Sequence, residues 1–308
     1  MNEDWKNSFN TRSPQNEDYG ELIESDLVRE ALAADPEPPA PDRRQPHLGY
    51  AIAFALIAVA ITPLVLAAVL GIGIALGQIP RDAARHLLDF PRATVFANLA
   101  GTALTVVVGW AIFQAMWHRF FWSVVQWNSS AVRGRAGKLV LIGVSMSLIA
   151  SAIERLLTLP KDMPIQAFFH SSSTLWMMTF YGVIVAPIFE ETLFRGMLLP
   201  SLAMAIDWFR RKPVAPEELW KHGLSRRAVA ISAVLTSVAF ASLHATQLGN
   251  AWNAVAVLVC VGLGLAFVRL RYDSLACSVL VHSAYNGSLF LGMFLATSGY
   301  RHLDVLNK

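Results

Sequence analysis

The chain has 308 residues, of which 55% are hydrophobic and 15% are charged, with a formal net charge of +3 and a mean hydropathy of +0.45. Soluble domains carry about 25% charged residues, so this composition excludes an ordinary soluble enzyme and indicates a membrane protein. The sequence contains no nucleic-acid-binding motif, and its basic residues lie mostly between hydrophobic runs, which suits contact with membrane lipids.

The first 47 residues differ from the rest of the chain in charge and composition. They hold 5 Lys and Arg against 11 Asp and Glu, a net charge of −6, and end in the proline-rich sequence DPEPPAPDRRQP. They lack the basic flank and apolar core of a signal peptide, and we do not expect one here. We expect residues 1–47 to be a largely disordered tail, which could recruit a protein partner.

Seven long apolar runs follow the tail, and a helix that crosses the hydrocarbon core needs about 20 such residues. The runs are 48–77, 94–117, 138–158, 174–206, 228–245, 250–268 and 274–297. The first and fourth exceed one span and contain Pro63 and Pro187, so they indicate either tilted helices or an eighth, re-entrant element. We therefore expect an all-α, multi-pass bundle of seven or eight membrane helices over residues 48–300.

The loops between these runs differ in positive charge. With seven spans, one side of the membrane receives 15 Lys and Arg residues and the other side receives seven. Positive residues favour the cytoplasm, so we expect a multi-pass protein of the cell membrane with a cytoplasmic N-terminus.

The sequence VAPIFEETLFRGMLLP, residues 185–200, places two carboxylates and a guanidinium inside an apolar run. A charge at the centre of a membrane helix costs about 2.5–3.5 kcal/mol on insertion scales, so a compensating role is expected. Residues four apart share a helix face, so Glu191 and Arg195 can pair. Glu190 lies about 100° from Glu191 around the helix and therefore points at something else.

Two later runs carry the candidate partners of Glu190. The sequence FASLH places Phe240 four residues before His244, and HSAYN places His282 four residues before Asn286. Three helices could bring these polar side chains and Glu190 around one cavity. A carboxylate, two imidazoles and an amide can activate water, and the same set includes ligands that suit zinc. Taken singly, each feature is also explained by a hydrogen bond that clamps two helices together.

The three motifs EExxxR, FxxxH and HxxxN, in this order, resemble the CPBP (CAAX protease and bacteriocin-processing, Abi) family of intramembrane metalloproteases. The motifs read EETLFR, FASLH and HSAYN here, and the resemblance covers about residues 137–297. It implies a peptide hydrolase that cleaves a membrane-associated protein or peptide. It does not cover the acidic tail or the first two apolar runs.

The resemblance also implies roles for individual residues. Glu190 would be the general base that activates water, and His244 would help to hold that water. His282 and Asn286 would stabilise the oxyanion that develops on the scissile carbonyl.

The same resemblance implies supporting residues and, as one alternative, a metal ion. Glu191 and Arg195 would brace the helix, while Phe240 would line the pocket. A zinc ion held by His244 and His282 is an alternative to a metal-free glutamate mechanism, although the chain contains no HExxH motif.

Two other classes of function can use charged residues inside a membrane. An ion-coupled transporter predicts inverted repeats, and the two halves of this sequence show no evident self-similarity. A non-catalytic membrane scaffold or immunity factor would tolerate the loss of His244 or Asn286, and both residues are present.

Overall fold

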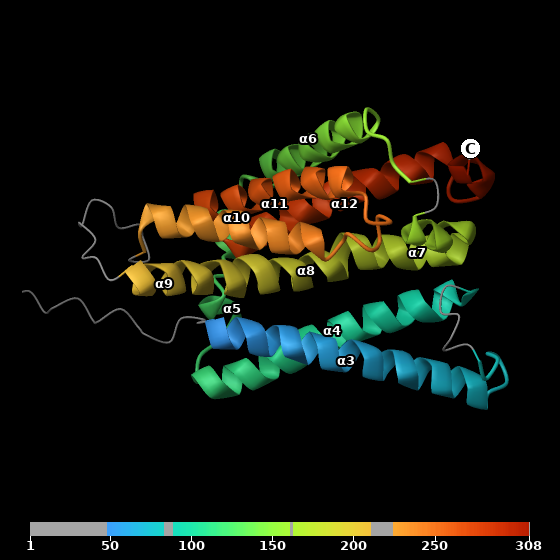
Figure 1. Cartoon of the computed structure of the whole chain (residues 1–308), viewed down its shortest axis with the longest axis horizontal. Coiled ribbons are helices and arrows are strands. Elements are labelled where there is room, and N and C mark those ends of the chain that lie inside the picture. Colours follow the sequence, from blue (N-terminus) through green and yellow to red (C-terminus); the bar gives the residue numbers. More distant parts are fainter. Residues whose placement is uncertain (1–47, 83–88, 161–162, 211–223, 308) are drawn as a thin grey trace, which may run out of the picture. The chain divides into compact units, whose positions relative to one another are not determined.

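The computed structural model describes residues 48–82, 89–160, 163–210 and 224–307. The acidic tail, residues 1–47, and most of the basic loop after the fourth run lie outside the described residues, so the expectation of a disordered tail stays a prediction. The described residues fold into the helices of Figure 1, and the all-α, multi-pass class is confirmed.

All seven apolar runs form helix. The bounds are α3 (Leu48–Ala75), α4 (Pro91–Trp117), α6 (Ala136–Glu154), α7 (Ser172–Phe180), α8 (Ala186–Glu191), α9 (Leu199–Arg210), α10 (Arg226–Ser242), α11 (Trp252–Tyr272) and α12 (Leu275–Ala296). Short elements include α5 (Phe121–Val124) and the 3₁₀ helix η4 (Pro164–His170). The fourth run becomes one rod, because the segments from α7 to α9 join without a break.

Six helical segments of the described chain are long and apolar enough to cross a membrane. The fifth predicted run, 228–245, forms α10, which has 17 residues and is not among these six. An eighth, re-entrant element is not found among the described residues. Helix α3 continues through Pro63, and Pro187 lies within the continuous rod, two residues after the end of the π segment Tyr181–Val185.

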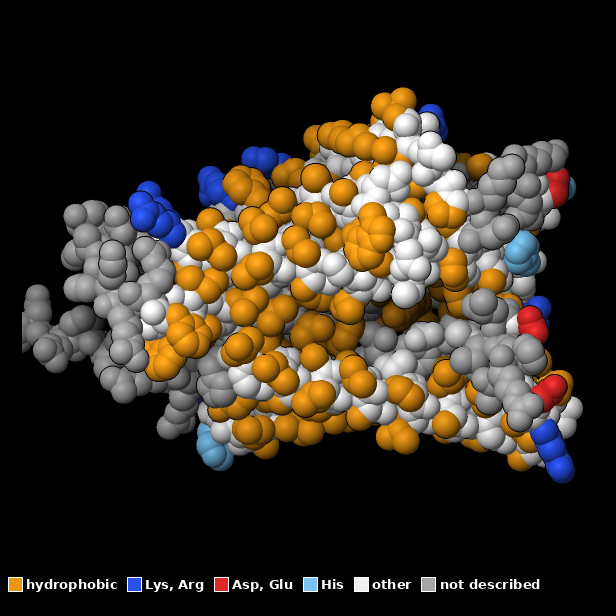
Figure 2. Space-filling model, in the orientation of Figure 1, with side chains coloured by type: hydrophobic (Ala, Val, Ile, Leu, Met, Phe, Trp, Pro, Cys, Tyr) orange, Lys and Arg blue, Asp and Glu red, His pale blue; other side chains and the backbone are white. Residues whose placement is uncertain are grey.

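The outer surface of the bundle is apolar. Only 6% of the residues in the 18-residue apolar stretch of α3 are buried. Large side chains such as Leu56, Val59 and Leu64 are more than half exposed. Figure 2 shows hydrophobic side chains spread over the visible face of the helices. Such a surface is compatible with lipid and would be costly in water.

Close helix packing places α12 against α6. A Cβ atom on Gly143 would lie 2.4 Å from the carbonyl oxygen of Val281, so only glycine allows this approach. Helix α12 also packs against α8, and α10 packs against residues Thr192–Leu198, which directly follow α8. The helices that carry the polar motifs are therefore neighbours.

An aromatic cluster joins α3 and α4 to this group of helices. The ring of Phe113 stacks on Trp117, with centroids 5.1 Å apart, and Phe54 stacks on Phe189, with centroids 5.8 Å apart. Because Phe189 directly precedes Glu190, packing by α3 helps to fix the segment that carries the two glutamates.

Candidate active site

The two glutamates end a short stretch of α-helix between two π-helical segments. Residues Tyr181–Val185 precede α8 and residues Thr192–Leu198 follow it, both in π conformation. Proline has no N–H and its ring crowds the preceding turn, so wider turns before Pro187 keep the rod continuous. π segments within α-helices occur frequently at functional sites.

Glu191 and Arg195 pair as the spacing predicts. Nη1 of Arg195 donates to Oε1 of Glu191 at 2.9 Å, and both side chains are fully buried. Nη2 of Arg195 donates to the carbonyl of Gly262 at 2.9 Å. A Cβ on Gly262 would lie 3.0 Å from Cβ of Ser237, so a glycine there keeps this carbonyl close to the guanidinium.

Phe240 packs at the centre of the polar groups. Its ring centroid lies 4.6 Å from Cζ of Arg195, 4.9 Å from the His244 ring and 5.8 Å from the His282 ring. The side chain is only 2% exposed. Phe240 therefore supports the guanidinium and both imidazoles through packing and a cation–π contact.

His282 lies between the two glutamates. Its Nδ1 donates to Oε1 of Glu191 at 3.0 Å, and its Nε2 lies 3.7 Å from Oε2 of Glu190. The hydroxyl of Ser278 donates to the other oxygen of Glu191. Because Nδ1–H is held by Glu191, Nε2 is the ring nitrogen presented to Glu190.

His244 approaches Glu190 from the residues that follow α10. Its Nδ1 donates to the carbonyl of Phe240 at 2.9 Å, and its Nε2 lies 4.0 Å from Oε1 of Glu190. The side chains of Glu190 and His244 are 19% and 25% exposed, whereas Glu191 is fully buried. The structure thus brings Glu190, His244 and His282 together from three helical segments.

Asn286 lies one helical turn beyond His282 but is engaged elsewhere. Its amide Nδ2 donates to the carbonyl of Gly182 at 2.6 Å, in the first π segment. The described hydrogen bonds therefore hold Asn286 beside this segment and do not join it to Glu190. Its second amide N–H is not used in that contact.

Two parts of the network are not anticipated from the sequence. The carbonyl of Gly262 gives no signal, because every residue has one. Ser278 does give a signal, since it lies four residues before His282, as His282 lies four before Asn286. The three side chains share one face of α12.

The described side chains do not form a complete three-ligand metal site. Within the described ranges, no group of three or more His, Cys, Asp or Glu residues is arranged to hold a metal ion. Two nitrogen or oxygen ligands of tetrahedral zinc lie about 3.4 Å apart. The separations of 3.7 and 4.0 Å from Glu190 to His282 and His244 are wider.

Comparison with protein families supports the resemblance that the motifs indicate. Residues 172–288 match the family model described as type II CAAX prenyl endopeptidase Rce1-like. The matched segment contains Glu190, His244, His282 and Asn286. The family of this model agrees with the resemblance to the CPBP family. No curated protein and no solved structure matches the chain.

Proposed function

We propose that this protein is an intramembrane endopeptidase of the CAAX-protease type, which hydrolyses a peptide bond of a membrane-associated protein or peptide. One observation carries the proposal: inside an apolar bundle, each carboxylate oxygen of Glu190 faces the Nε2 atom of a different histidine. Oε1 faces His244 and Oε2 faces His282. The family match over residues 172–288 supports a CAAX-type intramembrane protease.

The separations at Glu190 suit a bound water molecule. Atoms 3.7 to 4.0 Å apart are too distant for a direct hydrogen bond, yet both can lie about 2.8 Å from one water oxygen. In this proposal Glu190 accepts a proton from the water while the water oxygen attacks the carbon of the scissile carbonyl. Glu190 then gives the proton to the leaving amine, and the carbon–nitrogen bond breaks.

The neighbouring groups have separate tasks in this scheme. His244 holds the water through Nε2, since its Nδ1 is engaged by the carbonyl of Phe240. Glu191 orients His282 and stabilises it as an imidazolium, which carries a proton on Nε2 as well as on Nδ1. His282 and the free amide N–H of Asn286 then stabilise the oxyanion.

Replacement of Glu190 tests the proposal directly. We expect Glu190→Gln to abolish cleavage, because an amide cannot accept the proton from water. Glu154→Gln is the matched control, since Glu154 is a partly buried carboxylate at the end of α6 and makes none of the contacts described around Glu190. Peptide termini in native membranes would be compared by mass spectrometry for the wild-type protein and both variants. Identical termini in all three would favour a non-catalytic scaffold.

Metal removal tests the glutamate mechanism against its zinc alternative. The proton transfers assigned here use Glu190, and the described side chains offer no site with three ligands. We therefore expect purified, active protein to keep its cleavage rate after chelation. A rate that falls with chelation and returns with zinc would establish the alternative.

A further inference from the structure

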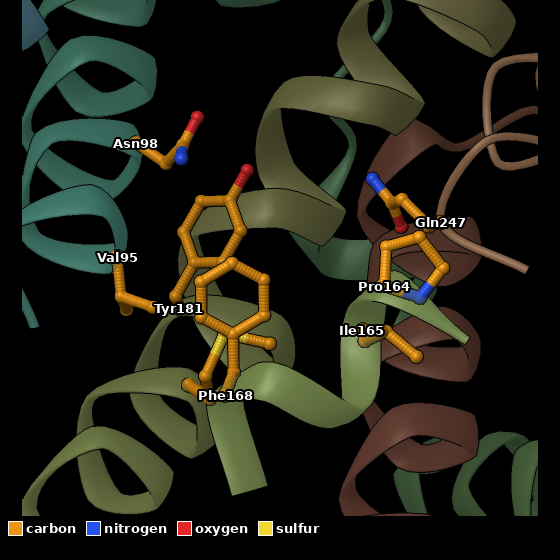
Figure 3. A pocket seen from close by; sticks show the side chains of 8 residues that line it. Val95, Asn98, Pro164, Ile165, Phe168, Tyr181 and Gln247 are labelled. Carbon is orange, nitrogen blue, oxygen red and sulfur yellow. The ribbon is translucent and has the colours of Figure 1, made fainter. Parts of the chain in front are cut away.

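A pocket of about 250 Å³ lies between α4, η4 and the first part of the continuous rod that runs from α7 to α9 and carries Glu190. Figure 3 shows the rings of Phe168 and Tyr181 near its middle, with Asn98 and Gln247 on opposite sides. The pocket is smaller than the roughly 300–1,000 Å³ typical of drug-sized ligands, so its volume suits one or two side chains.

Two of the lining residues connect the pocket to the site. Tyr181 directly precedes Gly182, whose carbonyl accepts a hydrogen bond from the amide of Asn286. Gln247 belongs to the turns that begin at His244, where the N–H of Leu248 donates to the carbonyl of His244 at 3.1 Å. None of the four proposed catalytic residues lines the pocket.

The distance from the pocket to Glu190 corresponds to a short peptide. Tyr181 and Glu190 lie nine residues apart on one rod, which at no more than 1.5 Å per residue places them at most about 13 Å apart along its axis. An extended peptide rises about 3.3–3.6 Å per residue, so about four residues span this distance.

The chemistry of the lining favours a peptide over a hydrocarbon chain. Val95, Ile165 and Phe168 are apolar, but Asn98 and Gln247 carry amides. Asn98 uses Nδ2 to donate to the carbonyl of Thr94 at 2.9 Å, which leaves its Oδ1 as an acceptor. A lipid chain would cover these amides without hydrogen-bonding to them, at a cost in free energy, whereas a peptide offers N–H and C=O groups.

We propose that this pocket selects substrates by binding an apolar side chain about four residues from the scissile bond. Asn98 and Gln247 hydrogen-bond to the substrate backbone beside that side chain. The proposal rests on the proposed endopeptidase function and adds a selectivity to it. Val95, Asn98, Ile165 and Phe168 lie outside the matched residues 172–288, whereas Tyr181 and Gln247 lie within them, so the family model covers only part of the pocket lining.

Two neighbouring phenylalanines of η4 provide a matched pair of variants. Phe168 lines the pocket and Phe169 does not, although both are partly buried in the same 3₁₀ helix. Phe168→Ala enlarges the pocket, and Phe169→Ala controls for a general loosening of η4.

Cleavage of synthetic peptides in liposomes measures the selectivity. Each position on both sides of the cleaved bond would be varied among Ala, Leu, Phe and Asp. We expect the wild-type protein to prefer Leu over Ala about 10-fold or more in kcat/KM at one position about four residues from the bond. Phe168→Ala should shift the preference at that position towards Phe, and Phe169→Ala should retain the wild-type preference. An unchanged profile in Phe168→Ala would overturn the proposal.

Binding to an inactive protein separates the pocket from the catalytic function. The same labelled peptides would be titrated against Glu190→Gln and against Glu190→Gln with Phe168→Ala, with fluorescence polarisation as the readout. Leu-selective binding that only the double variant loses supports the pocket even if the wild-type protein cleaves nothing, in which case only the endopeptidase function fails. Binding that depends on a lipid attached to the peptide, and not on the varied residue, would show a lipid site and refute the side-chain pocket.

Discussion

Glu191 holds the imidazole of His282, with its Oε1 accepting a hydrogen bond from Nδ1 at 3.0 Å. The same carboxylate binds Arg195 and Ser278, so it is saturated and fully buried. Glu190, its neighbour in sequence, is partly exposed and faces the Nε2 atoms of both histidines. Adjacent glutamates thus occupy different environments, one inside a buried network and one partly exposed between two histidines.

The buried pair of Glu191 and Arg195 predicts a coupled effect on stability. Arg195→Met should lower the free energy of unfolding by about 3–5 kcal/mol, because Glu191 would remain buried without its cation. Glu191→Gln should also destabilise the protein, since it leaves Arg195 uncompensated. The double variant should lose less than the sum of the two singles, as judged by thermal unfolding in detergent. Strictly additive losses would contradict the coupling.

Ser278 is predicted to position His282 through Glu191. Ser278→Ala removes one hydrogen bond to the carboxylate, and we expect kcat to fall about 10-fold with little change in KM. Ser288→Ala is the control, because Ser288 lies on the same helix and its hydroxyl donates to the carbonyl of Tyr285. Equal effects of the two substitutions on kcat would indicate a general effect on α12.

Asn286 provides a test of the oxyanion assignment. Asn286→Ala should lower kcat about 10²–10³-fold if its amide stabilises the developing charge. The hydrogen bond to Gly182 alone is worth about 1 kcal/mol, so the melting temperature should fall only modestly. A variant that loses thermal stability but keeps the wild-type kcat would assign Asn286 to helix packing.

Sidedness is predicted from the distribution of positive charge and can be measured with two cysteines. In Figure 1 the start of α3 and the end of α9 lie at one end of the bundle, and the chain's C-terminus lies at the other. Ser130, in the short 3₁₀ helix Ser129–Ala131 after α5, and Ser298, in the turn after α12, are both exposed. In a background with Cys260 and Cys277 replaced by Ala, Ser298→Cys should react with an impermeant maleimide in intact cells. Ser130→Cys should react only after permeabilisation, and the reverse pattern would place the N-terminus outside.

Composition and hydrophobic periodicity were sufficient to predict a multi-pass membrane protein. They were also sufficient to single out the charged residues inside its apolar runs. The apolar runs predict the membrane helices, because the length of a span is set by the thickness of the hydrocarbon core. The cost of charge in lipid singles out Glu190, Glu191 and Arg195. The pairing of Glu191 with Arg195 also follows from sequence, since the helical repeat fixes which residues of one helix share a face.

Contacts between helices required the tertiary structure. The helical repeat does not determine which face of α12 meets which face of α8, so the bond from His282 to Glu191 could not be predicted. The π segments and the bond from Asn286 to Gly182 depend on how Pro187 is accommodated in a packed rod. Sequence therefore determined which polar groups lie in the membrane. Packing of separate helices decided that Glu191 is neutralised by its neighbours, while Glu190 faces the two histidines.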